Sequence, residues 1–209
     1  MRTTVTCKVC RRLRMSVCGR EKCAFKRKPY PPGVHGKSFR RAGSEFGTQL
    51  MEKQKVKFLY GLRERQFRNY IADALKQKAM TTSEAVLNAL ETRLDNVVYR
   101  LGFAPTRAAA RQLTNHGHIF VKRKGLANFT RVTIPSYKLR IGDEVRIRPE
   151  SLKKGPFGNL EILIKKHMPP VWLELDREGY SGKVLAHPTS GEDISKGYNI
   201  SAIVEYYSR

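Results

Sequence analysis

Apolar residues recur at helical spacing in the middle of the chain, where they form one stripe along a predicted helix. The stripe consists of Leu90, Leu94, Val97, Val98 and Leu101. Gly102 is expected to end this helix, and Thr106 is a suitable N-cap for a second helix that ends at Gly117. A strand is predicted to begin at His118. The stretch 91–122 is therefore expected to fold as helix, turn, helix and strand.

The apolar pattern predicts further helices before this stretch and strands after it. Residues 45–60 are weakly amphipathic, 62–78 have a clear apolar face, and a cap at 81–83 begins the helix that leads into the central stretch. Alternation with a period of two predicts strands later in the chain. Those strands are 132–134, 145–147, 171–176, 183–186 and 200–207. The apolar run 160–167 fits a helix or a strand equally well.

All four cysteines of the chain lie within its first 23 residues. They are Cys7, Cys10, Cys18 and Cys23, with C-x2-C and C-x4-C spacings. Four thiolates at these spacings can close a tetrahedral site, for which zinc is the expected metal. Two disulfides or four free thiols are the alternatives without a metal, and an iron–sulfur cluster is the alternative occupant. Because disulfides are rare in a reducing compartment, we expect a zinc knuckle.

The charge of the chain is strongly positive and unevenly distributed. Lys and Arg number 41 against 18 Asp and Glu, which gives a net charge of +23. Residues 1–70 carry 19 basic and 4 acidic side chains, whereas 151–209 carry 8 and 7. This gradient predicts a polyanion that is bound mainly by the first two-thirds of the chain. Because the sequence shows neither a spanning apolar run nor a signal peptide, RNA or DNA in the cytoplasm is favoured over a membrane.

Polar residues beside the apolar stripes are the candidates for contact with phosphates. Arg93, Asn96 and Arg100 fall on one strip of the first central helix. The other candidates lie on the second central helix and the strand after it, on two upstream helices and in the basic Pro/Gly loop. They are Arg107, Arg111, Asn115, His116, Lys122, Lys53, Lys55, Arg65, Arg68, His35, Lys37, Arg40 and Arg41. We expect this set to grip an RNA backbone by its shape.

Several motifs of this chain resemble those of the small-subunit ribosomal protein four family. They are RLDNVVYRLGF, the R-x-x-A-R-Q-L of the next helix, HGHI, KPYPPGVHG, YGLRERQFRNY and the terminal EYYSR. Together they span nearly the whole chain, and the cysteines match the bacterial-type, zinc-knuckle form of the family. The resemblance implies a structural constituent of the cytoplasmic small ribosomal subunit.

The resemblance also implies particular partners. Members of that family bind a helical junction in the five-prime domain of small-subunit rRNA and nucleate assembly. Lys37, Arg40 and Arg41 would lie near the tunnel through which messenger RNA enters, although the two residues after Lys37 depart from the family pattern. Small-subunit proteins three and five are the implied neighbours. The loop 122–131 is longer than is usual in the family, and its basic residues either add phosphate contacts or face solvent.

An enzymatic function is the main alternative. The tripeptide Arg93-Leu94-Asp95 also occurs in RNA pseudouridine synthases, in which the aspartate is the nucleophile. Here Asp95 is expected in the middle of a helix, paired with an arginine or a backbone amide. The chain also lacks a glycine-rich phosphate loop, a metalloprotease motif and a nucleophile elbow. We therefore expect a non-enzyme with no small-molecule substrate, and a basic zinc protein that binds DNA is the second alternative.

The predicted fold class is α+β, with an N-terminal zinc-knuckle plus helical domain and a second domain of two short helices packed on a small curled antiparallel sheet. Residues 1–43 are expected to form the knuckle and the basic Pro/Gly loop, and 44–90 the helical part of the first domain. Residues 91–200 are expected to form the RNA-binding domain, with the helix-turn-helix-strand module at 91–150. Residues 201–209 are expected to form a C-terminal strand and tail that can return to the first domain.

Overall fold

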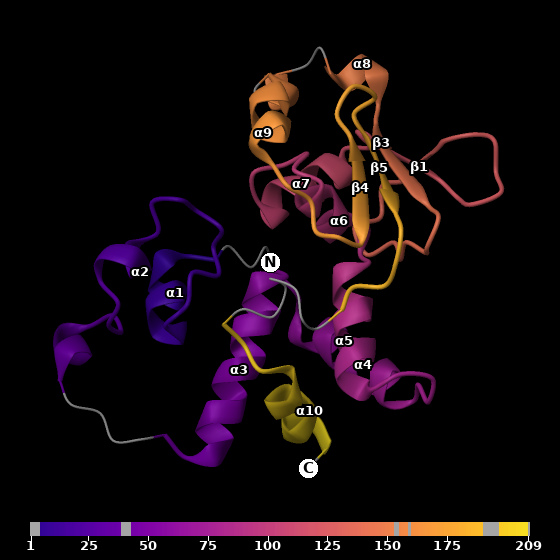
Figure 1. The fold of residues 1–209 in the computed structure, drawn as a ribbon. Helices are drawn as coiled ribbons and strands as arrows, with labels where there is room; N and C mark the ends of the chain where they lie inside the picture. Colours follow the sequence, from indigo (N-terminus) through magenta and orange to yellow (C-terminus); the bar gives the residue numbers. More distant parts are fainter. Residues whose placement is uncertain (1–4, 39–42, 153–154, 159, 190–196, 209) are drawn as a thin grey trace. The chain divides into compact units, whose positions relative to one another are not determined.

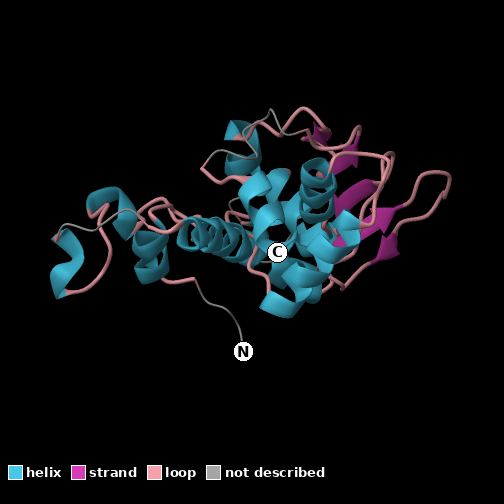
Figure 2. Ribbon diagram, turned by 90° about the horizontal axis from the view of Figure 1, so that it is seen from below, coloured by secondary structure: helices cyan, strands magenta, loops and turns pink. Residues whose placement is uncertain are grey.

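Helices and strands are distributed over two compact units in this computed structural model, which describes residues 5–38, 43–152, 155–158, 160–189 and 197–208. The first unit comprises Met1–Leu87 and Asp193–Arg209, and the second comprises Asn88–Glu192 (Figure 1). Among the described residues, all five strands belong to the second unit. Figure 2 draws the strands in magenta and the helices in cyan.

The first unit is helical in its described residues. Its elements are α1 (Cys7–Leu13), α2 (Ala24–Arg27), a 3-10 turn (Val34–Lys37), α3 (Glu45–Leu59), α4 (Glu64–Leu75) and α10 (Ile200–Ser208), and α5 (Thr82–Glu91) begins in it. Ser44 caps α3 by accepting a hydrogen bond from the Gly47 backbone N–H at 3.2 Å. Thr81 and Glu84 bond reciprocally at the start of α5, at 3.2 and 3.4 Å. The helices predicted upstream of the central stretch are thus confirmed.

The C-terminal segment forms helix α10, so the strand predicted for this segment is wrong. The Asn199 side chain caps the helix by accepting a hydrogen bond from a first-turn backbone N–H at 3.3 Å. Ile200 and Ile203 are buried, and Gln49 of α3 donates to Glu205 at 3.2 Å. The apolar residues of this segment fit a period of 3.6 as well as one of two, and packing against α3 selects the helix.

The second unit combines short helices with an antiparallel sheet whose strand order is β2-β1-β3-β5-β4. Its further elements are α6 (Leu94–Arg100), α7 (Arg107–Asn115), β1 (Ile119–Lys122), β2 (Thr130–Arg131), β3 (Glu144–Ile147), α8 (Pro149–Leu152), a 3-10 turn (Gly155–Phe157), α9 (Leu160–Lys166), β4 (Leu173–Asp176) and β5 (Ser181–Val184). The predicted α+β class with a small antiparallel sheet is confirmed. The ambiguous run 160–167 is largely helical, and the strand predicted at 132–134 lies two residues earlier, as β2.

The core of the second unit includes the inner face of the sheet and the stripe predicted from the sequence. The inner strand positions are Ile119, Val121, Val145 and Ile147, each at most 1% exposed. The stripe residues from Leu90 to Leu101 are equally buried, as predicted, and so is Trp172. Gly182 of β5 lies against Leu101, because a Cβ added there would come within 2.4 Å of its side chain. The sheet therefore packs closely on the end of α6.

A break separates α5 from α6, where the sequence pattern predicts one continuous helix. α5 ends at Glu91 and α6 begins at Leu94, while Arg93 between them has extended backbone angles (φ −66°, ψ 138°). The backbone N–H groups of Leu94 and Asp95 donate to carbonyls of the loop 135–137 at 2.9 and 3.1 Å. This loop replaces the acceptors that a continuous helix would supply. Asp95 therefore lies in the first turn of α6 and not in the middle of a helix.

Candidate nucleic-acid interface and metal centre

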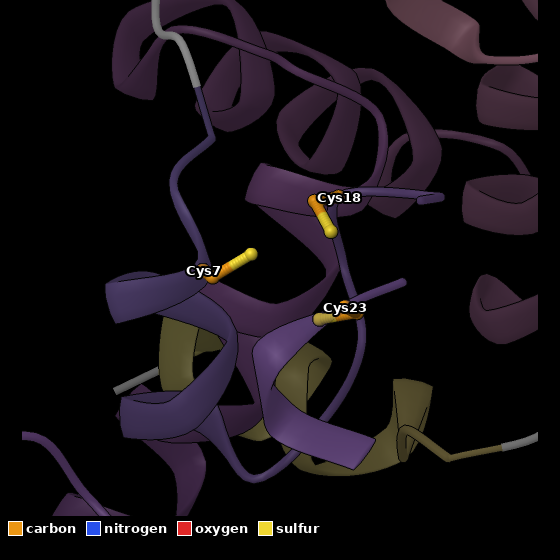
Figure 3. Close-up of side chains that lie close together, drawn as sticks. All are labelled: Cys7, Cys18 and Cys23. Carbon is orange, nitrogen blue, oxygen red and sulfur yellow. The ribbon is translucent and has the colours of Figure 1, made fainter. Parts of the chain in front are cut away.

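Three of the four cysteines converge on one point in the N-terminal segment. Cys7 begins α1, Cys18 lies in the following loop and Cys23 directly precedes α2, and Figure 3 shows their side chains pointing toward one another. Their Sγ atoms all lie within 4.8 Å of one another. Four thiolates around zinc, each about 2.3 Å from the metal, are about 3.8 Å apart. The three cysteines therefore fit a thiolate metal site after a small contraction.

Cys10 lies beside this group, so the predicted convergence of four cysteines is found for three of them. Burial raises the pKa of Cys10 to about 12, and a hydrogen bond with the Cys18 thiol acts in the same direction. Burial would also raise the pKa of Cys23, but hydrogen bonds from Ser16 and neighbouring groups outweigh it and lower the pKa to about 7. Since the thiolate is the form that binds metal, Cys23 is well prepared as a ligand.

Asp95 is the centre of a buried ion-pair network at the start of α6. Its side chain is 4% exposed, and it accepts hydrogen bonds from Arg93 at 3.1 and 3.0 Å. Arg111 of α7 donates to the same carboxylate through Nε at 2.9 Å and through Nη2 at 2.7 Å. The Arg93 side chain is 3% exposed and that of Arg111 is 30% exposed. One carboxylate is thus held by a deeply buried arginine and by one that reaches the surface.

Glu91 is the second carboxylate of this network and is completely buried. It accepts hydrogen bonds from Arg100 at 3.0 and 2.9 Å. Asn96 donates to the Glu91 carboxylate at 2.8 Å, and its own side-chain oxygen accepts from Arg107 Nε at 2.8 Å. Arg107 also lies over the Tyr99 ring, 4.5 Å from its centroid. The network thereby ties the end of α5 to α6 and α7.

These contacts correct the prediction that Arg93 and Asn96 lie on an exposed strip that faces RNA. They are 3% and 1% exposed, which is too little for contact with a phosphate. Arg100, Arg107 and Arg111 are partly buried, so part of the predicted strip does reach the surface. The physical reason is that two buried carboxylates need charged partners, which Arg93, Arg100 and Arg111 supply. Asn96 is buried because it donates to one of these carboxylates, Glu91.

Carboxylates also engage the lysines of α3 that were predicted to bind RNA. Lys53 is 6% exposed and donates to Glu64 at 2.7 Å, and Lys55 pairs with Glu52 at 2.7 Å. Burial would raise the pKa of Glu64, but hydrogen bonds from two lysines and from Tyr207 lower it to about 2. The burial of Lys53 is incompatible with its predicted contact with RNA.

The remaining predicted RNA ligands are mostly exposed. The exposed ones are Arg65, Arg68, His35, Lys37, Asn115 and His116. Lys122 is half-exposed and lies 3.7 Å from Glu144, whereas Arg40 and Arg41 lie outside the described residues. The segment around the cysteines adds exposed basic side chains, namely Lys8, Arg12, Arg14, Arg20, Lys22, Lys26, Arg27 and Lys28. The exposed positive charge of the first unit is therefore concentrated near the candidate metal centre.

Sequence reasoning missed two features of the basic surface. Arg11 donates to the backbone carbonyls of Tyr30 and Pro31 at 3.0 and 3.1 Å, and it lies 4.7 Å from the centroid of the Tyr30 ring. These contacts tie the basic Pro/Gly loop to α1, so its described part is not a free linker. The second feature is Phe129, which lies close to Arg146 on the sheet. In both cases, an aromatic residue inside a basic loop, Tyr30 or Phe129, was the sequence feature from which the contact could have been predicted.

Comparison with known proteins places the whole chain in one family. The profile of the Ribosomal protein S4/S9 N-terminal domain matches residues 2–91, and that of the S4 domain matches 92–145. The small ribosomal subunit protein uS4 of Syntrophomonas wolfei is 43% identical over 99% of this chain and 98% of its own length. The uS4 proteins of Thermus thermophilus and Caldicellulosiruptor bescii are 45% and 46% identical over 97% of this chain and 96% of their own lengths. Among the described residues, no helix has the length and apolarity to cross a membrane. The chain belongs to the uS4 family of small ribosomal subunit proteins.

Proposed function

We propose that this protein is a structural constituent of the small ribosomal subunit, and that it acts in the cytoplasm by binding a helical junction in the five-prime domain of the small-subunit rRNA. The similarity to uS4 proteins carries this proposal, because it extends over 97–99% of the chain at 43–46% identity. The S4-domain match covers α6, α7, β1 and β2, which contain the half-exposed arginines.

The mechanism is charge neutralisation by side chains that are already ordered. Exposed lysines and arginines of the N-terminal segment and of α4 would neutralise phosphates of converging RNA helices, with release of counterions. The buried carboxylates hold Arg100 and Arg111 in place, and the Asn96 side chain holds Arg107, so that less side-chain freedom is lost on binding. Recognition of this kind reads the shape of the RNA backbone more than its base edges.

The metal is proposed to be zinc, held by Cys7, Cys18 and Cys23 with Cys10 as the fourth ligand. Cys10 is hydrogen-bonded to Cys18 and Cys23, so it lies next to the converging group. A bound metal would order the N-terminal segment and fix its exposed basic residues in one arrangement. An iron–sulfur cluster is the alternative that elemental analysis would reveal.

Assembly nucleation and a place near the entering messenger RNA extend this proposal. Lys37 is exposed in the 3-10 turn, where it can contact a passing single strand. Its predicted companions Arg40 and Arg41 lie outside the described residues. Small-subunit proteins three and five are the proposed protein neighbours, and the nearly neutral segment after residue 150 is the proposed contact surface.

The rival function, RNA pseudouridine synthesis, needs Asp95 as a nucleophile. Asp95 is 3% exposed and is held by Arg93 and Arg111. A carboxylate in this position cannot reach an RNA base without dismantling its ion pairs. The relatives are named as ribosomal proteins, which agrees with a function that is not enzymatic.

Sedimentation with ribosomal subunits tests the proposal. Tagged protein should co-sediment with small subunits after a high-salt wash, and the purified protein should bind a junction fragment of the five-prime domain. Duplex DNA of equal length, at the same salt concentration, is the control for unspecific binding to a polyanion. Release from the subunits by the wash, or equal affinity for DNA, would contradict the proposed function.

A further inference from the structure

One end of the outer face of the sheet carries basic and aromatic side chains together. Residues alternate between buried and half-exposed along β1 and β3, and Phe120, Lys122 and Arg146 are among the half-exposed ones. The strand register pairs Phe120 with Arg131 of β2 and with Arg146 of β3, and pairs Lys122 with Glu144. Directly paired residues of antiparallel strands share one face. These side chains therefore lie together on the face away from the core.

The loop between β1 and β2 is anchored to this end of the sheet. The backbone N–H of Lys124 donates to Asp143 at 3.2 Å, and Asp143, which is 3% exposed, also accepts from the Arg140 backbone at 2.9 Å. At the other end of the loop, the Thr130 hydroxyl donates to the Val121 carbonyl at 3.1 Å. The sequence left open whether this basic loop faces solvent freely. These hydrogen bonds hold both of its ends.

The anchored loop ends at Phe129, whose ring lies near two cations. Lys122 Nζ is 5.6 Å and Arg146 Cζ is 5.8 Å from the ring centroid. Both distances fall within the range of about 6 Å over which a cation is attracted to an aromatic face. The Phe129 side chain is half-exposed. A partly accessible ring near an ammonium and a guanidinium group offers a stacking surface for a base and two charges for its phosphate.

We propose that Phe129, Lys122 and Arg146 form a binding site for an unpaired RNA nucleotide, separate from the arginines of α6 and α7. The base would stack on the Phe129 ring, and the adjacent phosphate would pair with the two cations. This inference rests on the proposed function, because it takes RNA as the partner. Bases of a double helix are already stacked on one another, so the site selects a single-stranded segment.

The local charge favours a polyanion as the occupant. Among the described strand residues of β1 to β3, Glu144 is the one carboxylate, and it is paired with Lys122 at 3.7 Å. Arg123, Lys124 and Arg131 are exposed around the site. An acidic peptide would satisfy these charges but would leave the Phe129 ring without a stacking partner. The aromatic ring therefore decides in favour of a nucleotide.

The test uses the full-length protein and a fluorescein-labelled octamer of uridine, with binding measured by fluorescence anisotropy at one salt concentration. Phe129→Leu keeps an apolar side chain but removes the stacking surface, and it should weaken binding about five- to a hundredfold. Phe46→Leu is the matched control, because Phe46 is 52% exposed on α3 and its ring lies 5.5 Å from that of Tyr206. The control should change the affinity less than twofold. Equal losses in both variants would overturn the proposal.

Photocross-linking keeps the proposal testable if Phe129→Leu lowers the stability of the protein. An octamer that contains 4-thiouridine, cross-linked to wild-type protein, should attach to the peptide that includes Phe129. Attachment confined to other peptides would overturn the proposal. Displacement of the octamer by an oligoglutamate of equal charge, at equal concentration, would also overturn it, since only the charge would then be recognised.

A parallel titration with the junction rRNA separates this proposal from the proposed function. Wild-type protein that binds the junction but not the uridine octamer would overturn the nucleotide site and leave the proposed function standing. Protein that fails to bind the junction would contradict the proposed function, while the octamer and the cross-link still decide whether the nucleotide site exists.

Discussion

Positive charge serves two different purposes in two regions of this protein. In the second unit, Arg93, Arg100 and Arg111 hold the buried carboxylates Glu91 and Asp95, and their side chains are 3%, 18% and 30% exposed. In the first unit, the basic residues around the cysteines are largely exposed, and those on α1 and in the following loop flank the candidate metal centre. The first group stabilises the fold of the second unit, whereas the second group lies on the surface of the first unit.

This difference shows that the role of a lysine or arginine, in folding or in RNA binding, can be inferred only when its nearest carboxylate is known. Burial of an unpaired charge is costly, so a buried carboxylate retains its arginines whether or not RNA is present. An exposed lysine or arginine contributes little to folding and remains available to a phosphate. Substitutions in the two regions should therefore separate stability from RNA affinity.

Removal of the metal should have the largest effect, and it should be confined to the first region. A structural zinc ion contributes on the order of 10 kcal/mol or more to the segment that it folds. We expect elemental analysis to find one metal ion per chain, and we expect chelation to unfold the N-terminal segment. Hydrogen exchange on the full-length protein should then show lost protection in α1 and α2, with α6 and α7 as the internal control. If the N-terminal segment kept its protection from hydrogen exchange after the metal was removed, the prediction of a zinc knuckle would be wrong.

Disruption of the arginine network should produce the next largest effect, and it should appear in stability. Asp95→Asn removes the charge that holds Arg93 and Arg111, and breaking a buried pair in this way costs about 3–5 kcal/mol. Urea unfolding measures this loss, with Asp73→Asn on the exposed face of α4 as the matched control. If the arginines of this region served only as ligands of RNA, the network could be disrupted with little loss of stability. A loss below about 1 kcal/mol would favour that view, since surface substitutions usually stay within about 0.5 kcal/mol.

Neutralisation of exposed charge should change RNA affinity and leave stability nearly unchanged. Replacing Arg20 and Lys22 with Gln should weaken junction binding, and each lost phosphate contact should make the salt dependence shallower by about 0.7–0.9. The matched control replaces Lys165 and Arg177, which are exposed in the nearly neutral C-terminal third. A larger loss of affinity in the control pair would show that RNA is bound mainly by that part of the chain.

The apolar periodicity was sufficient to predict most of the secondary structure, because buried stripes are local properties of the sequence. Leu94, Val97 and Leu101 are buried as predicted, and Thr106 caps α7 by accepting a hydrogen bond from the Ala109 backbone at 3.2 Å. Gly102 follows α6 with φ of +80°, a conformation that favours glycine. Helix ends of this kind depend on a few neighbouring residues, so they can be read from the sequence.

The predicted pairing of Asp95 with an arginine is confirmed by Arg93, which is two residues away. The other ion pairs of the network could not be predicted in the same way, because they depend on contacts between more distant residues. Arg111 is 16 residues from Asp95, and Arg100 is nine residues from Glu91. Two acidic residues close to Arg93 were the available signal, but the sequence pattern placed the arginines on helix faces without showing what those faces meet. The C-terminal helix was missed for a related reason, since its packing on α3 joins residues 156 positions apart.

Substitution of Glu64 should have the smallest effect on stability. This carboxylate is partly exposed, yet it is paired like the buried carboxylates of the second unit. Its side chain is 47% exposed, and it accepts hydrogen bonds from Lys53 at 2.7 Å, from Lys57 at 2.8 Å and from Tyr207 of α10 at 2.9 Å. These partners outweigh burial and lower the pKa of Glu64 from 4.5 to about 2. A lowered pKa means that the ionised carboxylate stabilises the folded state above about pH 4.5, and that this stabilisation is lost between about pH 4.5 and pH 2.

Glu64→Gln should therefore lower stability near neutral pH and flatten its dependence on acid. Because the pair is partly exposed, solvent screening limits the loss at pH 7 to about 1 kcal/mol or less. Urea unfolding at several pH values from 7 to 2 measures the difference between wild type and variant, which should shrink as the pH falls. Glu21→Gln, at an exposed position in the N-terminal segment, is the control and should follow the wild type throughout. If Glu64→Gln and wild type instead lost stability in parallel, Glu64 would behave as a surface carboxylate, and Lys57 would belong with the charges that RNA can use.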